Sequence, residues 1–343
     1  CNIVLPFQTI EQVDEPRAEK PSETAMQMSL FDMDERGRQL KGWTNKLIWG
    51  DNKLILSSLK NGPLRAEIEK QGGLKLIYID PPFDVGADFS MDVQIGGDTF
   101  TKKPNILEEI AYRDTWGRGA DSFIAMIYER LVLMRDLLAE DGSIYVHCDW
   151  RVNSFIRLVL DEVFNGLNFI AQIPWKRTSS HSDSKFFPYV HDTILLFGKT
   201  ERLIFNKQYE PLSKEYIKSK YRHQDRNGRR YRKDNLTATG LSGGGYTYEW
   251  NGVIKTWRCP KSKMKELESK GLISYTKNGV AEFKRYLETT KGTLVPDIWT
   301  DIAPVNSQAM ERVDYPTQKP ETLLERIINA SSNECDLIAD FFC

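Results

Sequence analysis

The sequence lacks paired cysteines, long apolar runs and internal repeats. Its five cysteines include no C-x-x-C pair, so neither a zinc site nor a disulfide framework is indicated, and we expect a cytoplasmic protein in a reducing compartment. No apolar stretch reaches the length needed to cross a bilayer, and no signal peptide is visible. These absences exclude a membrane protein and a secreted disulfide scaffold. What is present is the ordinary composition of a globular protein, with 40% hydrophobic and 28% charged residues.

A net charge of −1 hides a strong local asymmetry. Residues 199–233 carry 12 Lys and Arg against 4 Asp and Glu, an excess of +8, which leaves −9 for the rest of the chain. Four tyrosines are interleaved with these cations. Such a segment suits a polyanion such as nucleic acid, because Lys and Arg neutralise phosphate charge. A solvated basic face is the alternative, and charge alone does not separate the two.

Alternating strand and helix patterns organise most of the chain. They predict a mostly parallel sheet covered by helices, which is an α/β fold. An apolar stripe at helical spacing from Phe123 to Leu138 predicts a helix that Gly142 ends. The strand-like runs that we expect to form the sheet are residues 46–49, 74–79, 143–148, 168–173, 193–197 and 336–342.

The α/β pattern is interrupted between residues 201 and 305, where short strand-like runs predict an inserted module. Residues 1–44 are polar and predict a flexible N-terminal arm. The α/β core is expected over 45–200, and its pattern returns over 306–343. Within the core, residues 84–118 read as a long loop that is either functional or mobile.

The residues Asp80-Pro81-Pro82-Phe83 stand where the apolar strand 74–79 ends. Two prolines make a stiff turn, and ligands in open α/β sheets collect beyond the carboxyl ends of strands. An exocyclic amino group of a base is a poor nucleophile, so acceptors that hold its two hydrogens would stabilise the reacting geometry. Asp80 and the Pro81 carbonyl fit those roles, and Phe83 can stack on the base. A turn without chemistry is the alternative, because turns favour Asp and Pro.

Several further motifs occur together with this turn, and with them the chain resembles the β-class DNA amino-methyltransferases, which use S-adenosylmethionine. It is most similar to the adenine-N6 enzymes, including the modification subunits of type III restriction-modification systems. The motifs follow the order of that family over roughly residues 45–343. The matching residues are Gly50-Asp51-Asn52, Asp80-Pro81-Pro82-Phe83, Tyr128-Glu129-Arg130-Leu131, Asp141-Gly142-Ser143-Ile144, Tyr315-Pro316-Thr317-Gln318-Lys319-Pro320 and Asp340-Phe341-Phe342.

The resemblance implies a Rossmann-like methyltransferase sheet with a target-recognition module inserted at 201–305, a catalytic core at 45–200 and the start of the cofactor-binding part at 306–343. It makes Asp80 to Phe83 the catalytic turn. The residues that it places at the S-adenosylmethionine site are Thr317, Gln318, Lys319, Pro320, Asp340, Phe341 and Asp51. For Asp51, a turn residue that caps the next helix is an equal alternative. Asp114 is similar to a loop residue beside the target base, and a plain loop carboxylate is an equal alternative.

One departure from the family concerns the strand at Asp340. In the family this strand runs into a Gly-x-Gly loop, followed by an acidic residue that clamps the ribose. Here the sequence ends at Cys343. We therefore expect a C-terminally truncated chain.

The expected activity is a site-specific transfer of a methyl group to adenine N6 in double-stranded DNA, by base flipping and direct displacement without a metal. His147-Cys148-Asp149 reads as a strand end, because its spacing does not suit a ligand set. Cytosine-N4 methylation, a non-catalytic DNA-binding fragment, and methylation of RNA or protein are the alternatives. A homodimer and a restriction nuclease subunit are partners implied by the resemblance, and no membrane is. The residues expected to contact DNA are Lys220, Arg222, Arg226, Arg229 and Arg230, together with the aromatic and glycine-rich stretch 243–250.

Overall fold

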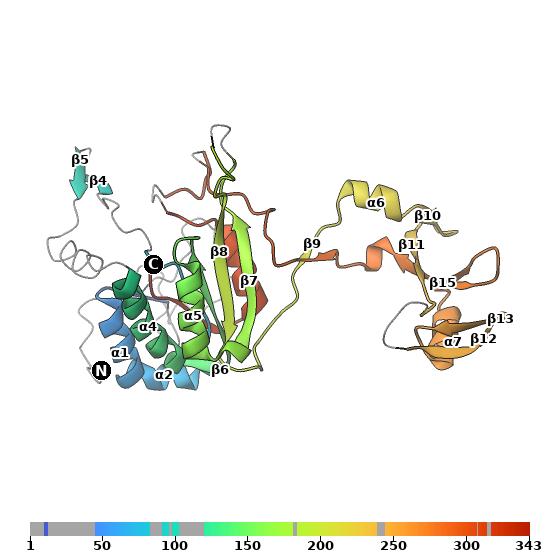
Figure 1. Cartoon of the computed structure of the whole chain (residues 1–343), viewed down its shortest axis with the longest axis horizontal. Helices are drawn as coiled ribbons and strands as arrows, with labels where there is room; N and C mark the ends of the chain where they lie inside the picture. Colours follow the sequence, from blue (N-terminus) through green and yellow to red (C-terminus); the bar gives the residue numbers. More distant parts are fainter. Residues whose placement is uncertain are drawn as a thin grey trace, which may run out of the picture. The chain divides into compact units, whose positions relative to one another are not determined.

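The protein is described by a computed structural model that divides into two compact units, each with its own apolar core. We call residues 1–206 with 296–343 the core unit, and residues 207–295 the inserted unit (Figure 1). The inserted unit lies within the segment 201–305 in which the sequence predicts a module. The residues that the structure describes are 10–12, 45–82, 91–95, 98–102, 120–180, 184–238, 244–306, 308–313 and 317–343.

The core unit alternates helices and strands. Its elements are β1 (Ile10–Gln12), β2 (Lys46–Ile48), α1 (Asn52–Asn61), α2 (Leu64–Lys70), β3 (Leu74–Ile79), β4 (Met91–Ile95), β5 (Asp98–Lys102), α4 (Ala120–Leu137), β6 (Leu138–Cys148), α5 (Asn153–Phe164), η3 (Gly166–Asn168), β7 (Phe169–Lys176), β8 (His191–Gly198), α8 (Glu321–Ser331) and β17 (Leu337–Asp340). The predicted α/β fold is confirmed. Of the predicted arm 1–44, only β1 is described, and it pairs with β2 in a separate two-stranded sheet. The expectation that residues 46–49 form part of the main sheet is therefore wrong. The predicted loop 84–118 contains a hairpin, β4–β5, that the sequence analysis missed.

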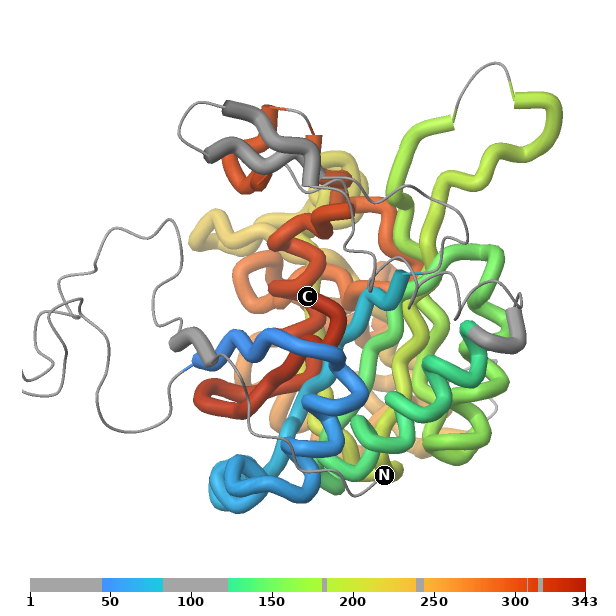
Figure 2. Tube along the Cα trace, turned by 90° about the vertical axis from the view of Figure 1, so that its left-hand side faces the viewer, coloured from blue at the N-terminus to red at the C-terminus, as the bar shows by residue number. Residues whose placement is uncertain are grey.

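The main sheet has the order β17-β3-β6-β8-β7 (Figure 2). Strands β17, β3 and β6 are parallel, whereas β8 runs antiparallel to both β6 and β7. Four of these five strands therefore run in one direction, as the prediction of a mostly parallel sheet requires, and β8 is the exception. The physical reason is the connection from β7 to β8, which forms a hairpin without a crossover helix.

Helices cover both faces of this sheet. Strand β3 is buried at Leu76, Ile77 and Ile79, whose alternate side chains face opposite layers. Helices α1, α4 and α5 lie on one side of the sheet (Figure 1), and their apolar side chains share one core cluster with Ile77 and Ile79. The predicted stripe of α4 is part of that cluster. On the other face, the Tyr145 hydroxyl lies 2.7 Å from the Ser331 hydroxyl of α8.

The junction of α4 and β6 differs from the prediction. Helix α4 ends at Leu137, five residues before the predicted stop at Gly142, and β6 already begins at Leu138. The pairing of β3 with β6 shifts register between Leu74 and Leu76, which accommodates the extra residues as a bulge. A Cβ at Gly142 would stand 2.8 Å from the Leu74 carbonyl oxygen, so close backbone approach requires glycine there.

The inserted unit is built from short antiparallel strands. Strands β10-β11-β15-β14 form one sheet, and β12 pairs with β13. Trp257 and Met264, both fully buried, form the centre of its core. Its elements are β9 (Tyr209–Glu210), α6 (Lys214–Lys220), β10 (His223–Gln224), β11 (Arg230–Asn235), β12 (Tyr246–Trp250), β13 (Val253–Trp257), α7 (Lys261–Ser269), β14 (Ile273–Tyr275), β15 (Ala281–Tyr286), η4 (Leu287–Thr289) and β16 (Thr293–Leu294). Among the described helices of either unit, none has the length and apolarity that a membrane crossing requires.

Candidate active site at the carboxyl end of β3

Two carboxylates stand at the ends of adjacent parallel strands. Asp80 directly follows β3, and Asp340 is the last residue of β17. The register pairs Asp340 with Tyr78, so both carboxylates come to the same edge of the sheet. Pro81, which is buried, and Pro82 fix the chain after Asp80. This edge is where an α/β sheet collects its ligands.

The Asp80 carboxylate uses one oxygen and leaves the other available. Lys319 Nζ donates to Asp80 Oδ2 and, at 3.1 Å, to the Thr317 carbonyl. The side chains of Lys319 and Asp80 are only 13% and 19% exposed, so solvent screens this ion pair weakly. Asp80 Oδ1 is buried and has no hydrogen-bond partner among the described residues. A buried carboxylate oxygen without a donor is costly, which marks it as an acceptor for a ligand group.

The electrostatics of Asp340 reflect this crowded edge. Although part of the residue reaches solvent, burial raises the pKa of its carboxyl from 3.8 to about 6. The negative charge of Asp80 raises this pKa further, while the Phe342 amide and Lys319 lower it. The Phe342 amide donates to Asp340 Oδ1 at 2.8 Å. The charged form of Asp340 is therefore poorly stabilised, and a cationic ligand would stabilise it.

A polar network ties three of the sequence motifs together. Asn52, the first residue of α1, donates to the Phe341 carbonyl at 3.0 Å and accepts from Arg130 Nε. Arg130 also forms an ion pair with Asp51 at 3.6 Å. The network thus joins α1 and α4 to the chain that follows β17. The sequence analysis quoted Asn52 and Arg130 within motifs but assigned neither of them to the site.

A second buried network lies beneath the turn at Asp80 and was missed from the sequence. The Tyr78 hydroxyl lies 2.9 Å from His147 Nδ1, and His147 Nε2 lies 3.2 Å from Asp192 Oδ2. All three residues are at most 8% exposed. Burial raises the pKa of Tyr78, and the nearby Asp80 adds to this. The alternation of strand residues could have placed Tyr78 on the same face as Asp80, but no local pattern indicated Asp192.

Within the described ranges no group of three or more His, Cys, Asp or Glu side chains could hold a metal ion. Burial raises the pKa of the Cys148 thiol well above its usual value, which disfavours the thiolate that a metal requires.

Some predicted cofactor residues are engaged in structural contacts. Asp51 caps α1, since its Oδ1 accepts from the amides of Lys53 and Leu54 at 2.9 and 3.2 Å. The Gln318 side chain bonds the Glu311 carbonyl at 2.7 Å, which anchors the chain ahead of α8. Pro320 is the N-cap of α8, one residue before its first turn. Predicted residues that lie outside the described part are Phe83, Asp114, Tyr315 and Pro316.

Comparison with known proteins places this arrangement in a family. A family model described as a DNA methylase matches residues 74–343, which is more than three quarters of the sequence. This chain belongs to the DNA methylase family. Its match to the type II methyltransferase M.EcaI of Enterobacter cloacae has 31% identity over 304 residues. That match covers 87% of this chain and 62% of the relative.

A second relative is the StyLTI Mod subunit, from a type III restriction-modification enzyme of Salmonella typhimurium. The two are 29% identical over 324 residues, which is 87% of this chain and 48% of the relative. The chain therefore spans about half to two thirds of the length of these relatives. The solved M1.HpyAVI–SAM complex matches 85% of this chain and 78% of its own, with 12% identity and a TM-score of 0.37, and carries no functional argument.

The predicted DNA contacts all lie in the inserted unit. Arg229 forms ion pairs with Asp225 at 2.8 Å and Glu288 at 3.4 Å, so its charge is largely compensated. The other four are exposed around the end of α6 and the turn between β10 and β11, namely Lys220, Arg222, Arg226 and Arg230. Their role in DNA binding stays a prediction.

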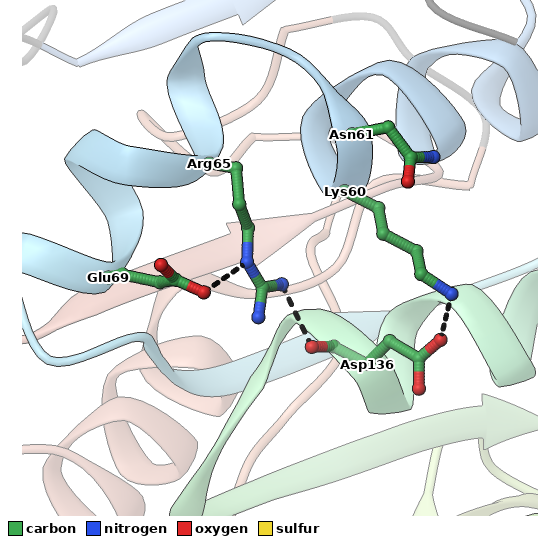
Figure 3. Close-up of a pocket in the computed structure, with 5 residues that line it drawn as sticks. All are labelled: Lys60, Asn61, Arg65, Glu69 and Asp136. Atoms are coloured by element: carbon green, nitrogen blue, oxygen red, sulfur yellow. Dashed lines mark hydrogen bonds and ion pairs between the residues drawn. The ribbon is translucent and has the colours of Figure 1, made fainter. Parts of the chain in front are cut away.

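A surface hollow of about 490 Å³ lies at the other edge of the main sheet (Figure 3). Lys60 and Asn61 at the end of α1, Arg65 and Glu69 of α2 and Asp136 of α4 line it. Lys60 pairs with Asp136, and Arg65 with Glu69 at 2.7 Å. Because its charges are already paired and it lies where β3 and β6 begin, this hollow is a poor candidate for the site.

Proposed function

We propose that the protein transfers a methyl group from S-adenosylmethionine to an exocyclic amino group of a base in double-stranded DNA. Adenine N6 is the proposed acceptor. Membership of the DNA methylase family supports the reaction class. We prefer adenine because the proposed catalytic turn begins with Asp, as it does in the adenine-N6 enzymes that the chain resembles.

The single observation that carries the proposal is a carboxylate oxygen of Asp80 that lacks a hydrogen-bond donor in the described part of the chain. Its Oδ1 is buried without a donor among the described residues, at the end of a rigid strand and before two prolines. An amino group has two hydrogens to donate. One can go to Asp80 Oδ1 and the other to the Pro81 carbonyl, which leaves the nitrogen lone pair free to attack. Fixed acceptors stabilise the positive charge that develops on this nitrogen, and no reorganisation is needed during the reaction.

The same edge fits the proposed cofactor. S-adenosylmethionine supplies the methyl group when it is bound. Because it carries positive charge, it suits the carboxylate of Asp340, whose charged form is otherwise poorly stabilised. The Phe341 carbonyl, held by Asn52, and Lys319 complete the proposed holding residues. Asp80, by contrast, is assigned to the base, because its available oxygen is an acceptor for an amino group.

The wider context is also a proposal. M.EcaI and StyLTI Mod are named as a type II methyltransferase and a subunit of a type III restriction-modification enzyme. We infer that this chain acts on DNA within a restriction-modification system, with the inserted unit as its target-recognition module. A nuclease subunit and a second copy of the chain remain proposed partners.

Two other functions make different predictions. Cytosine-N4 methylation poses the same amino-group problem, and a non-catalytic DNA-binding chain would use the inserted unit alone. Incubation of the protein with unmethylated genomic DNA and S-adenosylmethionine, followed by digestion to nucleosides and mass spectrometry, separates them. We expect N6-methyladenine. Formation of N4-methylcytosine alone would show that the acceptor is cytosine N4 and not adenine N6. Absence of any methylated nucleoside despite DNA binding would overturn the proposal.

A further inference from the structure

Four aromatic side chains are exposed on the core unit near the connection of β7 to β8. Their exposed fractions are 48% for Trp150, 78% for Phe186, 98% for Phe187 and 61% for Tyr189. Trp150 and Tyr189 stack, with ring centroids 4.3 Å apart and planes 8° from parallel. We call these four residues the aromatic edge. Phe186 and Phe187 precede Tyr189 by three and two residues along the chain, and exposed apolar groups near one another mark a surface that contacts something else.

Strand register places the aromatic edge on the same side of the sheet as Asp80. Strand β3 pairs Ile79 with Val146 of β6, so Asp80 and the residues after Cys148 leave the sheet at one edge. Strand β8 runs the other way and begins at this edge, and β7 ends there, because Lys176 pairs with His191. Figure 2 shows the yellow-green connection between β7 and β8 reaching beyond this end of the sheet.

The charge around the aromatic edge favours a polyanion. Residues 176–192 contain three Lys or Arg and two Asp. Arg177 pairs with Asp192 at 3.4 Å, which leaves the charges of Lys176 and Lys185 for a ligand. Lys176 and Lys185 are exposed, and Lys185 Nζ lies 5.5 Å from the centre of the Phe186 ring. Aromatic rings interleaved with cations are what proteins use to hold unpaired nucleic acid, since rings stack on bases and cations neutralise phosphates. A second copy of the chain docked here by two-fold symmetry would instead bring like charges together.

We propose that the aromatic edge stacks on bases that lose their partners when the target base leaves the duplex, while Lys176 and Lys185 contact the flanking phosphates. This inference rests on the proposed function, because moving a base into a pocket leaves its neighbours and its former partner unstacked. The edge then offsets part of the free energy of opening the duplex. The aromatic edge belongs to the core unit, whereas the cationic residues predicted to contact DNA belong to the inserted unit.

The test compares two fluorescent duplexes of identical mixed sequence, one intact and one with a single abasic position. Binding of the full chain is measured by anisotropy. We expect the wild type to prefer the abasic duplex. In the variant Phe186→Ala/Phe187→Ala, this preference should fall by roughly 5- to 150-fold for each stacked base lost, while affinity for the intact duplex is unchanged.

Two matched variants control this test. Phe205 is 52% exposed and lies at the opposite edge, beside Ile204, whose amide bonds the Asp141 carbonyl at 2.9 Å. Phe205→Ala should leave the preference unchanged. Lys185→Glu should weaken binding to both duplexes and lower the slope of log affinity against log salt by about 1, as loss of a phosphate contact does.

Several outcomes would overturn the inference: a wild type without the preference, an aromatic variant that keeps it, or an equal loss in Phe205→Ala. If the aromatic variant stopped self-associating but kept the preference for the abasic duplex, the aromatic edge would bind a second copy of the chain, and the inference would also be overturned. The nucleoside assay gives a separate answer. If the protein methylates DNA but the aromatic variant keeps the preference for the abasic duplex, only this inference is wrong. If the preference depends on the aromatic edge but no methylated nucleoside forms, only the proposed function is wrong.

Discussion

At the scale of single residues, protonation of Asp340 makes both the stability of the protein and the proposed cofactor binding depend on pH. Its pKa in the folded chain is about 6, above the usual 3.8. The folded chain therefore binds this proton more tightly than the unfolded chain, and the contribution of Asp340 to stability falls as pH rises from about 4 to about 6. Over the same range the carboxyl becomes charged, so the proposed cationic cofactor should bind more tightly.

For Asp340→Asn we expect both effects to disappear. Calorimetric titration of wild type with S-adenosylmethionine should show affinity increasing with an apparent pKa near 6, whereas the variant should bind weakly with little pH dependence between pH 5 and 7. Thermal unfolding at the same pH values should show the variant gaining stability relative to wild type as pH rises. Identical pH profiles for the two proteins would contradict the role given to Asp340.

How far sequence could locate the site differs from residue to residue. Asp80 was found because a carboxylate between an apolar strand and two prolines is a local pattern with a chemical meaning. The contact of Asn52 with Arg130 spans 78 residues, and that of His147 with Asp192 spans 45. Apolar periodicity specifies which face of an element is buried, but it does not specify which polar groups meet across the fold. Those pairings had to come from the structure.

At the scale of elements, strand direction was the feature that sequence did not determine. A buried apolar run has the same pattern whether its neighbour is parallel or antiparallel, so the sequence placed β8 along the chain but did not indicate that it runs against the other strands. The consequence for the site is direct. Because β7 and β8 form a hairpin, their connection lies at the same edge as Asp80, where a crossover helix would have carried the chain to the other edge.

The polar link between α1 and the end of β17 yields a prediction at this scale. Asn52→Ala removes the donor to the Phe341 carbonyl and the acceptor of Arg130, whose side chain is only 12% exposed. We expect a loss of about 1–3 kcal/mol in unfolding free energy, because buried polar groups are left unsatisfied. Urea denaturation measures it. Affinity for S-adenosylmethionine should fall as well, since Phe341 leads out of β17.

Asn61→Ala is the matched control for this prediction. Asn61 ends the same helix, and its side chain bonds only the Ser57 carbonyl of its own helix at 2.9 Å among the contacts described. This variant should cost less stability and leave cofactor affinity unchanged. If both variants lowered cofactor affinity equally, the link from α1 to Phe341 would have no special part in the site.

At the scale of the whole molecule, the two units have separate cores, so damage to one should spare the function of the other. Trp257 is fully buried in the inserted unit, and its indole donates to the Tyr248 carbonyl at 2.9 Å. Trp257→Ala should destabilise this unit by about 3–5 kcal/mol. DNA affinity should then fall in anisotropy titrations while S-adenosylmethionine affinity persists, because all the proposed cofactor residues lie in the core unit.

Ile254→Ala provides the comparison for Trp257→Ala. Ile254 lies on the same strand but is 70% exposed, so its loss should be nearly neutral for stability and leave DNA affinity in place. Equal loss of cofactor binding and DNA binding in Trp257→Ala would show that the units do not divide the two tasks.

The central claim is that the Asp80 carboxylate holds the amino group that accepts the methyl. The most direct measurement is single-turnover transfer of a radiolabelled methyl group from S-adenosylmethionine to unmethylated genomic DNA, by wild type and by Asp80→Asn, with cofactor and DNA saturating. Asn keeps the shape of the side chain but replaces an acceptor by a donor. The account predicts that the rate falls about 100- to 1,000-fold while cofactor and DNA affinities stay close to wild type. Transfer at the wild-type rate by Asp80→Asn would contradict it.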